Sequence, residues 1–205
     1  MTKITYYGHS CFIVSAENGY TVCFDPYEND SVPGLRLPQP MLADKVICSH
    51  EHKDHNASHL ITIRKDGPEN PWKISALSVP HDHHEGAHRG MNAITILQND
   101  DEKIIHFGDL GRELKKGEAE LLKNAGVIMI PCAGYYTIDA IEARRTIELL
   151  KPQLTILMHY RFADTGYDVQ MSRTEVEKYI PAENLMGNAV EYGERQGIIT
   201  LKPLQ

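Results

Sequence analysis

The chain has 205 residues, of which 41% are hydrophobic and 24% charged, so its length suits one well-buried domain and not two large ones. Its 21 Lys and Arg residues against 28 Asp and Glu give a formal net charge of −7, without a long basic run. This balance disfavours a dedicated nucleic-acid binder. The sequence also lacks a membrane-spanning apolar stretch and an export signal, so we expect a cytoplasmic protein with no membrane partner.

The first elements are predicted to be short β-strands. Runs rich in β-branched and aromatic residues predict an antiparallel meander over 4–7, 11–14 and 20–24. A proline-rich stretch over 33–40 has no periodicity and predicts an ordered loop. The run 45–49 predicts another strand, and 56–65 has a plausible helical face.

The rest of the chain alternates strands with helices. Asp139 and Glu142 form a predicted capping box for a helix that reaches about residue 150, and a second short helix is expected over 173–179. Apolar runs predict strands over 73–79, 93–97, 103–107, 127–130, 154–158 and 197–201. Strands that face helices on more than one side indicate a layered α/β sandwich, which we expect to be a single domain over residues 1–205.

Histidine is distributed very unevenly. Four of the 11 histidines lie within residues 50–59 and four more within 81–88, which indicates metal or proton chemistry. The 4 cysteines stand far apart in or beside apolar runs, without a CxxC pair, and are expected to be reduced core residues.

The central motif is His50-x-His52-x-Asp54-His55, which directly follows an apolar strand. Alternate side chains of an extended segment point to opposite sides, so these four groups cannot all close on one tetrahedral ion. Two adjacent ions resolve that geometry. A helical His-Glu-x-x-His zinc site is excluded because residue 54 is Asp.

Three further candidate ligands stand where predicted strands end: His81, Asp109 and His159. Strand ends of an α/β sheet are where such folds collect the residues of a site. Each alone could be a polar residue in a solvated turn, but together with the central motif they indicate one metal centre.

These residues resemble the metallo-β-lactamase superfamily, and within it the metal-dependent hydrolase branch that includes L-ascorbate 6-phosphate lactonase-like proteins. The matching pieces follow the family's order from residue 4 to about residue 160. They are Gly8-His9-Ser10 with Phe12, Asp25-Pro26, the segment from His50 to His55, His81-Asp82, Arg89-Gly90-x-Asn92, Phe107-Gly108-Asp109-Leu110, Tyr136-Thr137-Ile138-Asp139 and Met158-His159-Tyr160.

The resemblance implies a four-layer αββα sandwich with two divalent metal ions in a cleft at one edge of the sheets. In that arrangement one ion would be held by His50, His52 and His81, the other by Asp54, His55 and His159, with Asp109 bridging. Imidazole and carboxylate ligands suit zinc, which we expect, and also manganese or iron. Members with a redox di-iron centre have Glu where this chain has His52, so hydrolysis is favoured.

The resemblance further implies a hydrolase that uses a metal-bound hydroxide to cleave an ester, lactone or phosphoester bond. Two divalent cations outweigh the two carboxylates and one hydroxide by about one positive charge, so the expected substrate is a small anionic molecule. Asp54 and His9 are the predicted catalytic residues. The alternatives are a phosphodiesterase or nuclease-type hydrolase, and a metal-binding sensor without turnover.

Several roles stay open in the sequence. His83 or His84 could replace His81 in another register, although the resemblance aligns Arg89-Gly90 and Asn92 with the family's pattern and so implies His81. His9 either faces the cleft or closes a turn, and Asp25 is expected to orient a ligand histidine. The residues Arg89, Arg112 and Arg161 could each clamp an anion or form a salt bridge, and Tyr136 could gate the cleft, donate a proton or pack on the core.

Overall fold

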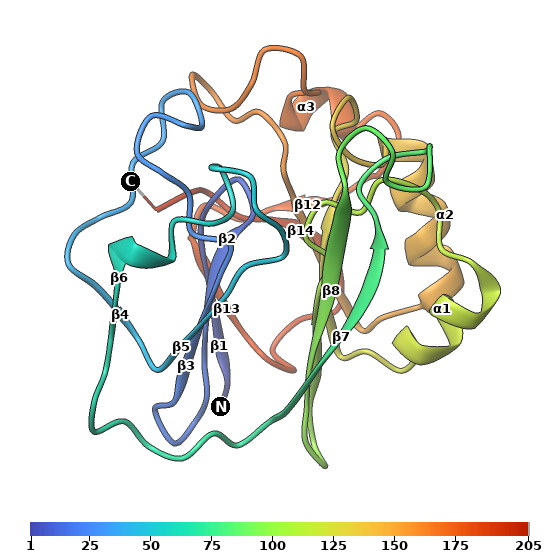
Figure 1. Cartoon of the computed structure of the whole chain (residues 1–205). Coiled ribbons are helices and arrows are strands. Elements are labelled where there is room, and N and C mark those ends of the chain that lie inside the picture. Colours follow the sequence, from blue (N-terminus) through green and yellow to red (C-terminus); the bar gives the residue numbers. More distant parts are fainter. Residues whose placement is uncertain (205) are drawn as a thin grey trace.

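The computed structural model describes residues 1–204 and consists of two β-sheets that pack face to face (Figure 1). The first sheet has the strand order β13-β1-β2-β3-β5. Its strands are β1 (Lys3–Gly8), β2 (Cys11–Ser15), β3 (Thr21–Phe24), β5 (Lys45–Ile47) and β13 (Ala189–Glu191). The meander from β1 to β3 is antiparallel, as predicted, while β5 runs parallel to β3.

The second sheet has the order β12-β14-β11-β10-β9-β8-β7. Its strands are β7 (Lys73–Pro80), β8 (Met91–Gln98), β9 (Lys103–His106), β10 (Val127–Pro131), β11 (Leu154–Met158), β12 (Glu183–Asn184) and β14 (Gly197–Thr200). The pairs from β12 to β9 are parallel, and β8 and β7 add antiparallel strands at one edge. Every residue of β10 and β11 is buried, because this sheet is covered on both faces.

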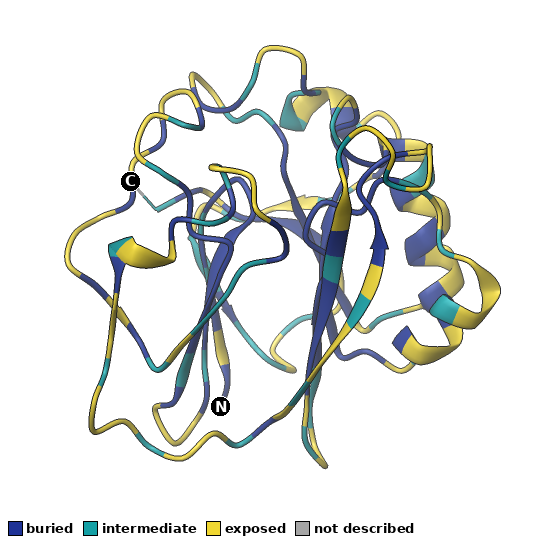
Figure 2. Ribbon diagram, in the orientation of Figure 1, coloured by how far each residue is buried: buried dark blue, intermediate teal, exposed yellow. Residues whose placement is uncertain are grey.

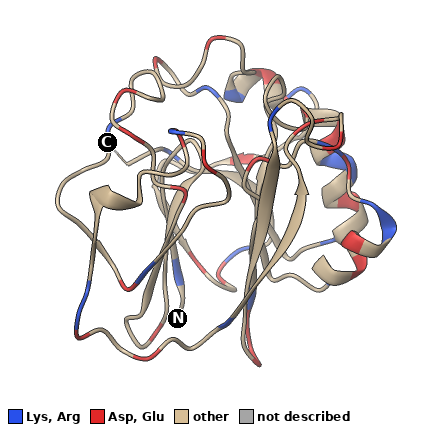
Figure 3. Cartoon of the chain, viewed as in Figure 1, with Lys and Arg blue, Asp and Glu red and all other residues tan. Residues whose placement is uncertain are grey.

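Helices cover the outer face of the seven-stranded sheet. They are α1 (Lys116–Leu122) and α2 (Ala140–Leu150), and the short α3 (Arg173–Val176) lies near one end of the sheets. The inner side of α2 is buried and its outer side is exposed (Figure 2). Acidic and basic residues are interspersed along α1 and α2 (Figure 3). Among residues 1–204, none of the helices has the length and apolar character needed to cross a membrane.

A different layer covers the outer face of the five-stranded sheet. The proline-rich loop, the 3-10 helix η1 (Ser58–Leu60) and the small sheet of β4 (Met41–Ala43) and β6 (Ile61–Ile63) lie on this side. Their apolar side chains form a second core cluster with the outer residues of β2 and β3. Its buried members are Cys11, Ile13, Cys23, Tyr27, Val32, Leu35, Leu37, Met41, Ala43 and Ile61. The layered α/β sandwich is confirmed, with an ordered loop and a single 3-10 turn in place of a long helix here.

The prediction of a helix over 56–65 is therefore wrong. The segment forms η1 and then β6, which pairs in parallel with β4 from Met41 to Ala43. The sequence Ile-Thr-Ile of β6 consists of β-branched residues, which favour strands over helices. Helix α1 was not predicted, because its seven residues include Gly117 and only Ala119 and Leu122 are buried.

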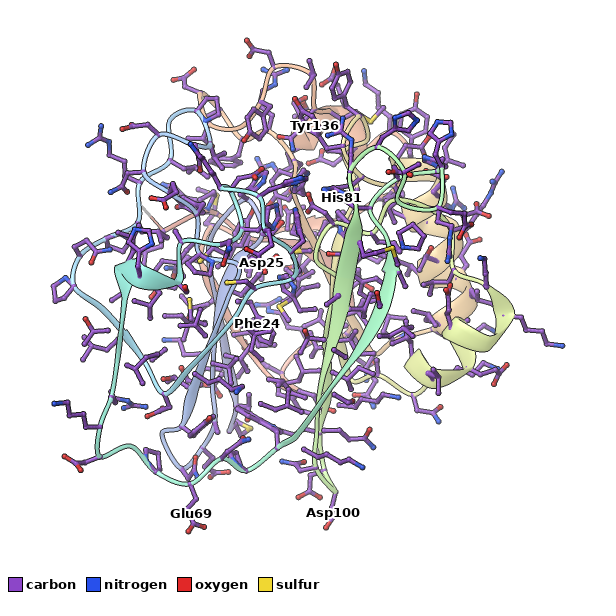
Figure 4. All side chains as sticks on the ribbon, viewed as in Figure 1. Phe24, Asp25, Glu69, His81, Asp100 and Tyr136 are labelled. Atoms are coloured by element: carbon purple, nitrogen blue, oxygen red, sulfur yellow. The ribbon has the colours of Figure 1, made fainter. Side chains whose placement is uncertain are left out.

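The two sheets place the ends of several strands at one edge of the sandwich. Asp25, His81 and His159 directly follow β3, β7 and β11, and Asp109 follows β9 after two residues. Asp25 and His81 lie at this edge in Figure 4, whereas Asp100 lies in the turn at the opposite end. The fold thus brings together side chains that are far apart in the sequence.

Gly108 holds the turn before Asp109 in a conformation that favours glycine, with φ of +52°. A Cβ atom there would lie 2.5 Å from Ser49 Cβ and would overlap Asn92. Gly108→Ala is expected to lower the free energy of unfolding by about 2–3 kcal/mol, measured by urea denaturation. Gly117→Ala is the control, because a Cβ in that helix meets no atom within 4 Å and should stabilise by about 0.5–1 kcal/mol. Equal effects of the two substitutions would contradict this prediction.

Candidate metal centre

The first group of candidate ligands consists of His50, His52 and His81. Their ligand atoms lie within 4.8 Å of one another, and His50 Nε2 is 3.0 Å from His52 Nδ1. His50 and His52 follow β5, whereas His81 comes from the end of β7 in the other sheet. His50 and His81 are buried, and His52 is exposed at the mouth of the site.

The second group consists of His9, Asp54, His55 and His159, again with ligand atoms within 4.8 Å of one another. His9 Nε2 lies 3.3 Å from Asp54 Oδ2, and the rings of His9 and His159 have centroids 4.0 Å apart. His9 and His159 both adopt positive φ angles, of 55° and 63°. The His159 amide donates to the His9 carbonyl at 2.9 Å, so one backbone contact fixes both strained residues beside each other.

Asp109 lies between the two groups. Its Oδ2 atom is 3.2 Å from both His55 Nε2 and His159 Nε2, and 3.5 Å from His81 Nε2. His50 Nε2 is 4.0 Å away. The amide of Asp109 donates to Asn92 Oδ1 at 2.8 Å, which fixes the turn that carries the carboxylate. All seven predicted ligands are therefore brought together, with the one carboxylate at the centre.

The spacing and hydrogen bonding of these atoms fit bound cations. Zinc binds nitrogen and oxygen at about 2.0–2.2 Å, which places two tetrahedral ligands about 3.4 Å apart. Several buried ligand atoms have no hydrogen-bond partner among the described residues, namely His55 Nε2, His159 Nε2 and Asp109 Oδ1. Buried polar atoms without partners are unfavourable, and a cation between them would satisfy them.

Outer hydrogen bonds orient two of the histidines. Asp25 Oδ2 accepts from His55 Nδ1 at 2.8 Å and from the Ser49 hydroxyl at 2.7 Å. This contact agrees with the expected orienting role of Asp25. Gln170 Nε2 lies 2.7 Å from His159 Nδ1, although Gln170 and its segment carry no motif in the sequence. The sequence also did not indicate Tyr167, whose hydroxyl lies 3.2 Å from Asp54 Oδ2.

The electrostatics of the site favour neutral imidazoles at His9, His50 and His81. Burial, and then neighbouring histidines, lower the pKa of His50 to about 3 and those of His81 and His9 to about 4. Neutral imidazole is the form that binds metals. Burial also acts to lower the pKa of His55, but Asp109 and Asp25 outweigh it and raise that pKa. The same two carboxylates would also favour a cation bound at His55 Nε2.

Other histidines and arginines of the sequence analysis lie outside the two groups. His83 Nε2 is 2.7 Å from Glu142, and the ring of His84 packs against that of His88. Arg112 donates two 2.8 Å hydrogen bonds to the Glu118 carboxylate, so of its two possible roles it forms a structural salt bridge. The geometry thus places His81, and neither His83 nor His84, beside Asp109.

His81→Ala is expected to weaken metal binding by at least about 100-fold, because it removes a nitrogen from the first group. His83→Ala is the matched control and should leave metal content unchanged, since His83 contacts Glu142 on the surface. Both proteins would be analysed by elemental analysis after dialysis. Loss of metal from the His83 variant alone would contradict the assignment.

Several known proteins are similar to this chain in sequence and in fold. Residues 3–159 match the family described as Beta-lactamase superfamily domain. A UPF0173 metal-dependent hydrolase of Carboxydothermus hydrogenoformans is 24% identical, over 77% of this chain and 84% of that protein. A crystal structure from Thermotoga maritima, described as a candidate Zn-dependent hydrolase of the metallo-β-lactamase superfamily, has a TM-score of 0.76 and 27% identity, and covers 98% of each chain. The metallo hydrolase Igni18 of Ignicoccus hospitalis shares the fold, with a TM-score of 0.65, 21% identity and coverage of 86% and 89%. These similar proteins are named metal-dependent hydrolases, and this chain belongs to the β-lactamase superfamily domain family.

Proposed function

We propose that the protein is a hydrolase with two divalent metal ions in adjacent positions. His50, His52 and His81 would hold one ion, Asp54, His55 and His159 the other, and Asp109 would bridge them. The observation that carries this proposal is the position of Asp109 Oδ2, within 4.0 Å of histidine nitrogens from both groups. Zinc is the metal we propose first, with manganese or iron as alternatives because the ligands are imidazole and carboxylate.

Two such cations, when bound, acidify water and polarise a carbonyl or phosphoryl oxygen. The protein's own part is to fix and orient the groups around them. Asp54 is held at Oδ2 by His9 Nε2, at 3.3 Å, and by the Tyr167 hydroxyl, at 3.2 Å. His55 Nε2 also lies 3.8 Å from Oδ2, and among the described residues no side chain donates a hydrogen bond to Asp54 Oδ1. We therefore propose His9 and Asp54 as the catalytic pair, with the neutral imidazole of His9 positioning the carboxylate.

The proposed substrate is a small molecule with an ester, lactone or phosphoester bond. A cavity of about 480 Å³ lies beside His81 and is lined by the loops that follow β7 and β10. This volume is in the range of small-molecule sites. Among these bonds we propose a lactone first, because the sequence motifs resemble those of lactonase-like proteins.

The proposal is tested by elemental analysis of the purified protein, coupled to an assay with a panel of lactones, esters and phosphoesters. We expect two equivalents of metal per chain. We also expect activity on at least one ester class that is abolished by a chelator and restored by zinc or manganese. Less than one equivalent of metal, together with activity that survives chelation, would overturn the proposal.

A further inference from the structure

The loop between β7 and β8 carries Arg89 back to the metal centre. It leaves the sheet at His81 and returns at Gly90, whose carbonyl accepts from the His81 amide at 3.0 Å. The Asp82 carboxylate accepts from four backbone amides of the loop, those of His84, Gly86, His88 and Arg89, at 2.7–3.0 Å. The loop is therefore built around one buried carboxylate, and the Arg89 backbone is fixed beside His81.

The side chain of Arg89 lies over an aromatic ring on the wall of the cavity. Its guanidinium carbon is 4.5 Å from the centre of the Tyr136 ring. Arg89, Tyr136 and His81 all line the 480 Å³ cavity, and Figure 4 shows Tyr136 and His81 at the same end of the sandwich. Stacking on an aromatic face restrains the plane of the guanidinium while its N–H groups stay available.

Arg89 differs from the other two arginines near the motif residues. Arg112 is paired with Glu118 at 2.8 Å, and Arg161 lies 3.8 Å from Glu175. Across residues 1–204, Arg89 has no carboxylate within 4.0 Å and donates no side-chain hydrogen bond. A half-buried guanidinium without a counter-ion is uncommon, because its five N–H groups require acceptors.

The carboxylates that line the same cavity accept hydrogen bonds from other groups. Asp82 holds the loop amides, and Asp139 caps α2 by accepting from the amides of Ile141 and Glu142. Glu142 is paired with His83 at 2.7 Å and accepts from the Asp139 amide at 3.0 Å. Among residues 1–204, Arg89 is the one arginine or lysine on the cavity wall, and none of these three carboxylates lies within 4.0 Å of its guanidinium nitrogens.

We propose that Arg89 is the specificity-determining residue of the substrate cavity and binds an anionic oxygen group of the substrate, a carboxylate or a phosphate. Two parallel N–H groups of a guanidinium match the two oxygens of either group. The scissile bond would then lie toward Asp109, on the side of the cavity formed by His81. This inference rests on the proposed function and adds the substrate class and the residue that selects it.

Isothermal titration calorimetry with inorganic phosphate and, separately, with acetate tests the proposal on protein of known metal content. Arg89→Ala is expected to weaken the binding of at least one of these anions by about tenfold or more. Arg89→Lys should recover only part of the loss, because an ammonium group cannot bind two oxygens in parallel. Arg145→Ala is the matched control, since Arg145 is exposed on α2 and paired with Glu113, and it should bind as the unchanged protein does.

A loss confined to phosphate, or to acetate, would support the proposal and identify the anion. Binding of both anions by Arg89→Ala with the affinity of the unchanged protein would overturn it, because the anions would then contact the metal ions alone. Failure of the unchanged protein to bind either anion would overturn it as well. Thermal unfolding of each variant checks the fold. These titrations need no turnover, so a failure of the proposed hydrolysis would appear in the assay panel and not in the effect of Arg89.

Discussion

Asp109→Asn is expected to lower kcat/KM by about 10³-fold or more and to reduce the metal content below two equivalents. The reason is geometric, because Asp109 Oδ2 lies 3.2–3.5 Å from nitrogens of His55, His81 and His159, and no other carboxylate of residues 1–204 lies within 4.0 Å of all three. An amide of the same shape keeps the packing but removes the negative charge between the two groups. Elemental analysis and steady-state kinetics on one preparation would measure both effects.

Asp100→Asn is the control for that experiment. Asp100 is exposed in the turn between β8 and β9, at the end of the sandwich opposite to His81 (Figure 4). The same loss of charge there should change neither metal content nor kcat/KM. Full activity and two equivalents of metal in Asp109→Asn would exclude Asp109 as a bridging ligand.

Asp54→Ala should separate a centre with two ions from one with a single ion. Asp54 belongs to the second group and is not among the three histidines of the first. We expect the variant to keep about one equivalent of metal and to lose about 10²–10⁴-fold in kcat/KM. The substitution also frees His9 and Tyr167 from the shared carboxylate oxygen, at 3.3 and 3.2 Å in the unchanged protein.

Asp168→Ala provides a control from the same side of the site, because Asp168 is exposed and lies next to Tyr167. It should behave as the unchanged protein in both measurements. Undiminished metal content and turnover in Asp54→Ala would refute the mechanism with two ions. Loss of both equivalents would instead indicate that the two positions fill cooperatively.

Most of the candidate metal ligands could be predicted from the sequence. The motif His50-x-His52-x-Asp54-His55 lies within six consecutive residues, so its metal-binding chemistry could be predicted from the sequence alone. His81, Asp109 and His159 could be predicted because each follows an apolar strand, and strand ends of a layered sheet meet at one edge. The lactonase-like branch that the motifs suggested is narrower than the family match, which establishes the superfamily.

Other residues could not be predicted, because their roles depend on long-range contacts. Gln170 contacts His159 from a loop of irregular structure, where neither periodicity nor spacing carries information. The segment from 61 to 63 becomes a strand because β4 offers it a partner, and pairing with a distant strand overrides local helical spacing. Contacts of this kind are absent from any window of the sequence.

The sequence by itself determined the candidate ligands, their order along the chain and the class of layered α/β fold, because these follow from residue types and local periodicity. Only the tertiary structure decided which of the three arginines beside the motifs lacks a nearby carboxylate. In the sequence, all three candidate arginines stand beside motif residues, and nothing distinguishes them. In the structure, Glu118 pairs with Arg112 and Glu175 lies near Arg161, whereas Arg89 lies over the ring of Tyr136. A charged side chain can bind a ligand when folding leaves it beside the site without a counter-ion. Whether it lacks a counter-ion depends on the positions of all its neighbours.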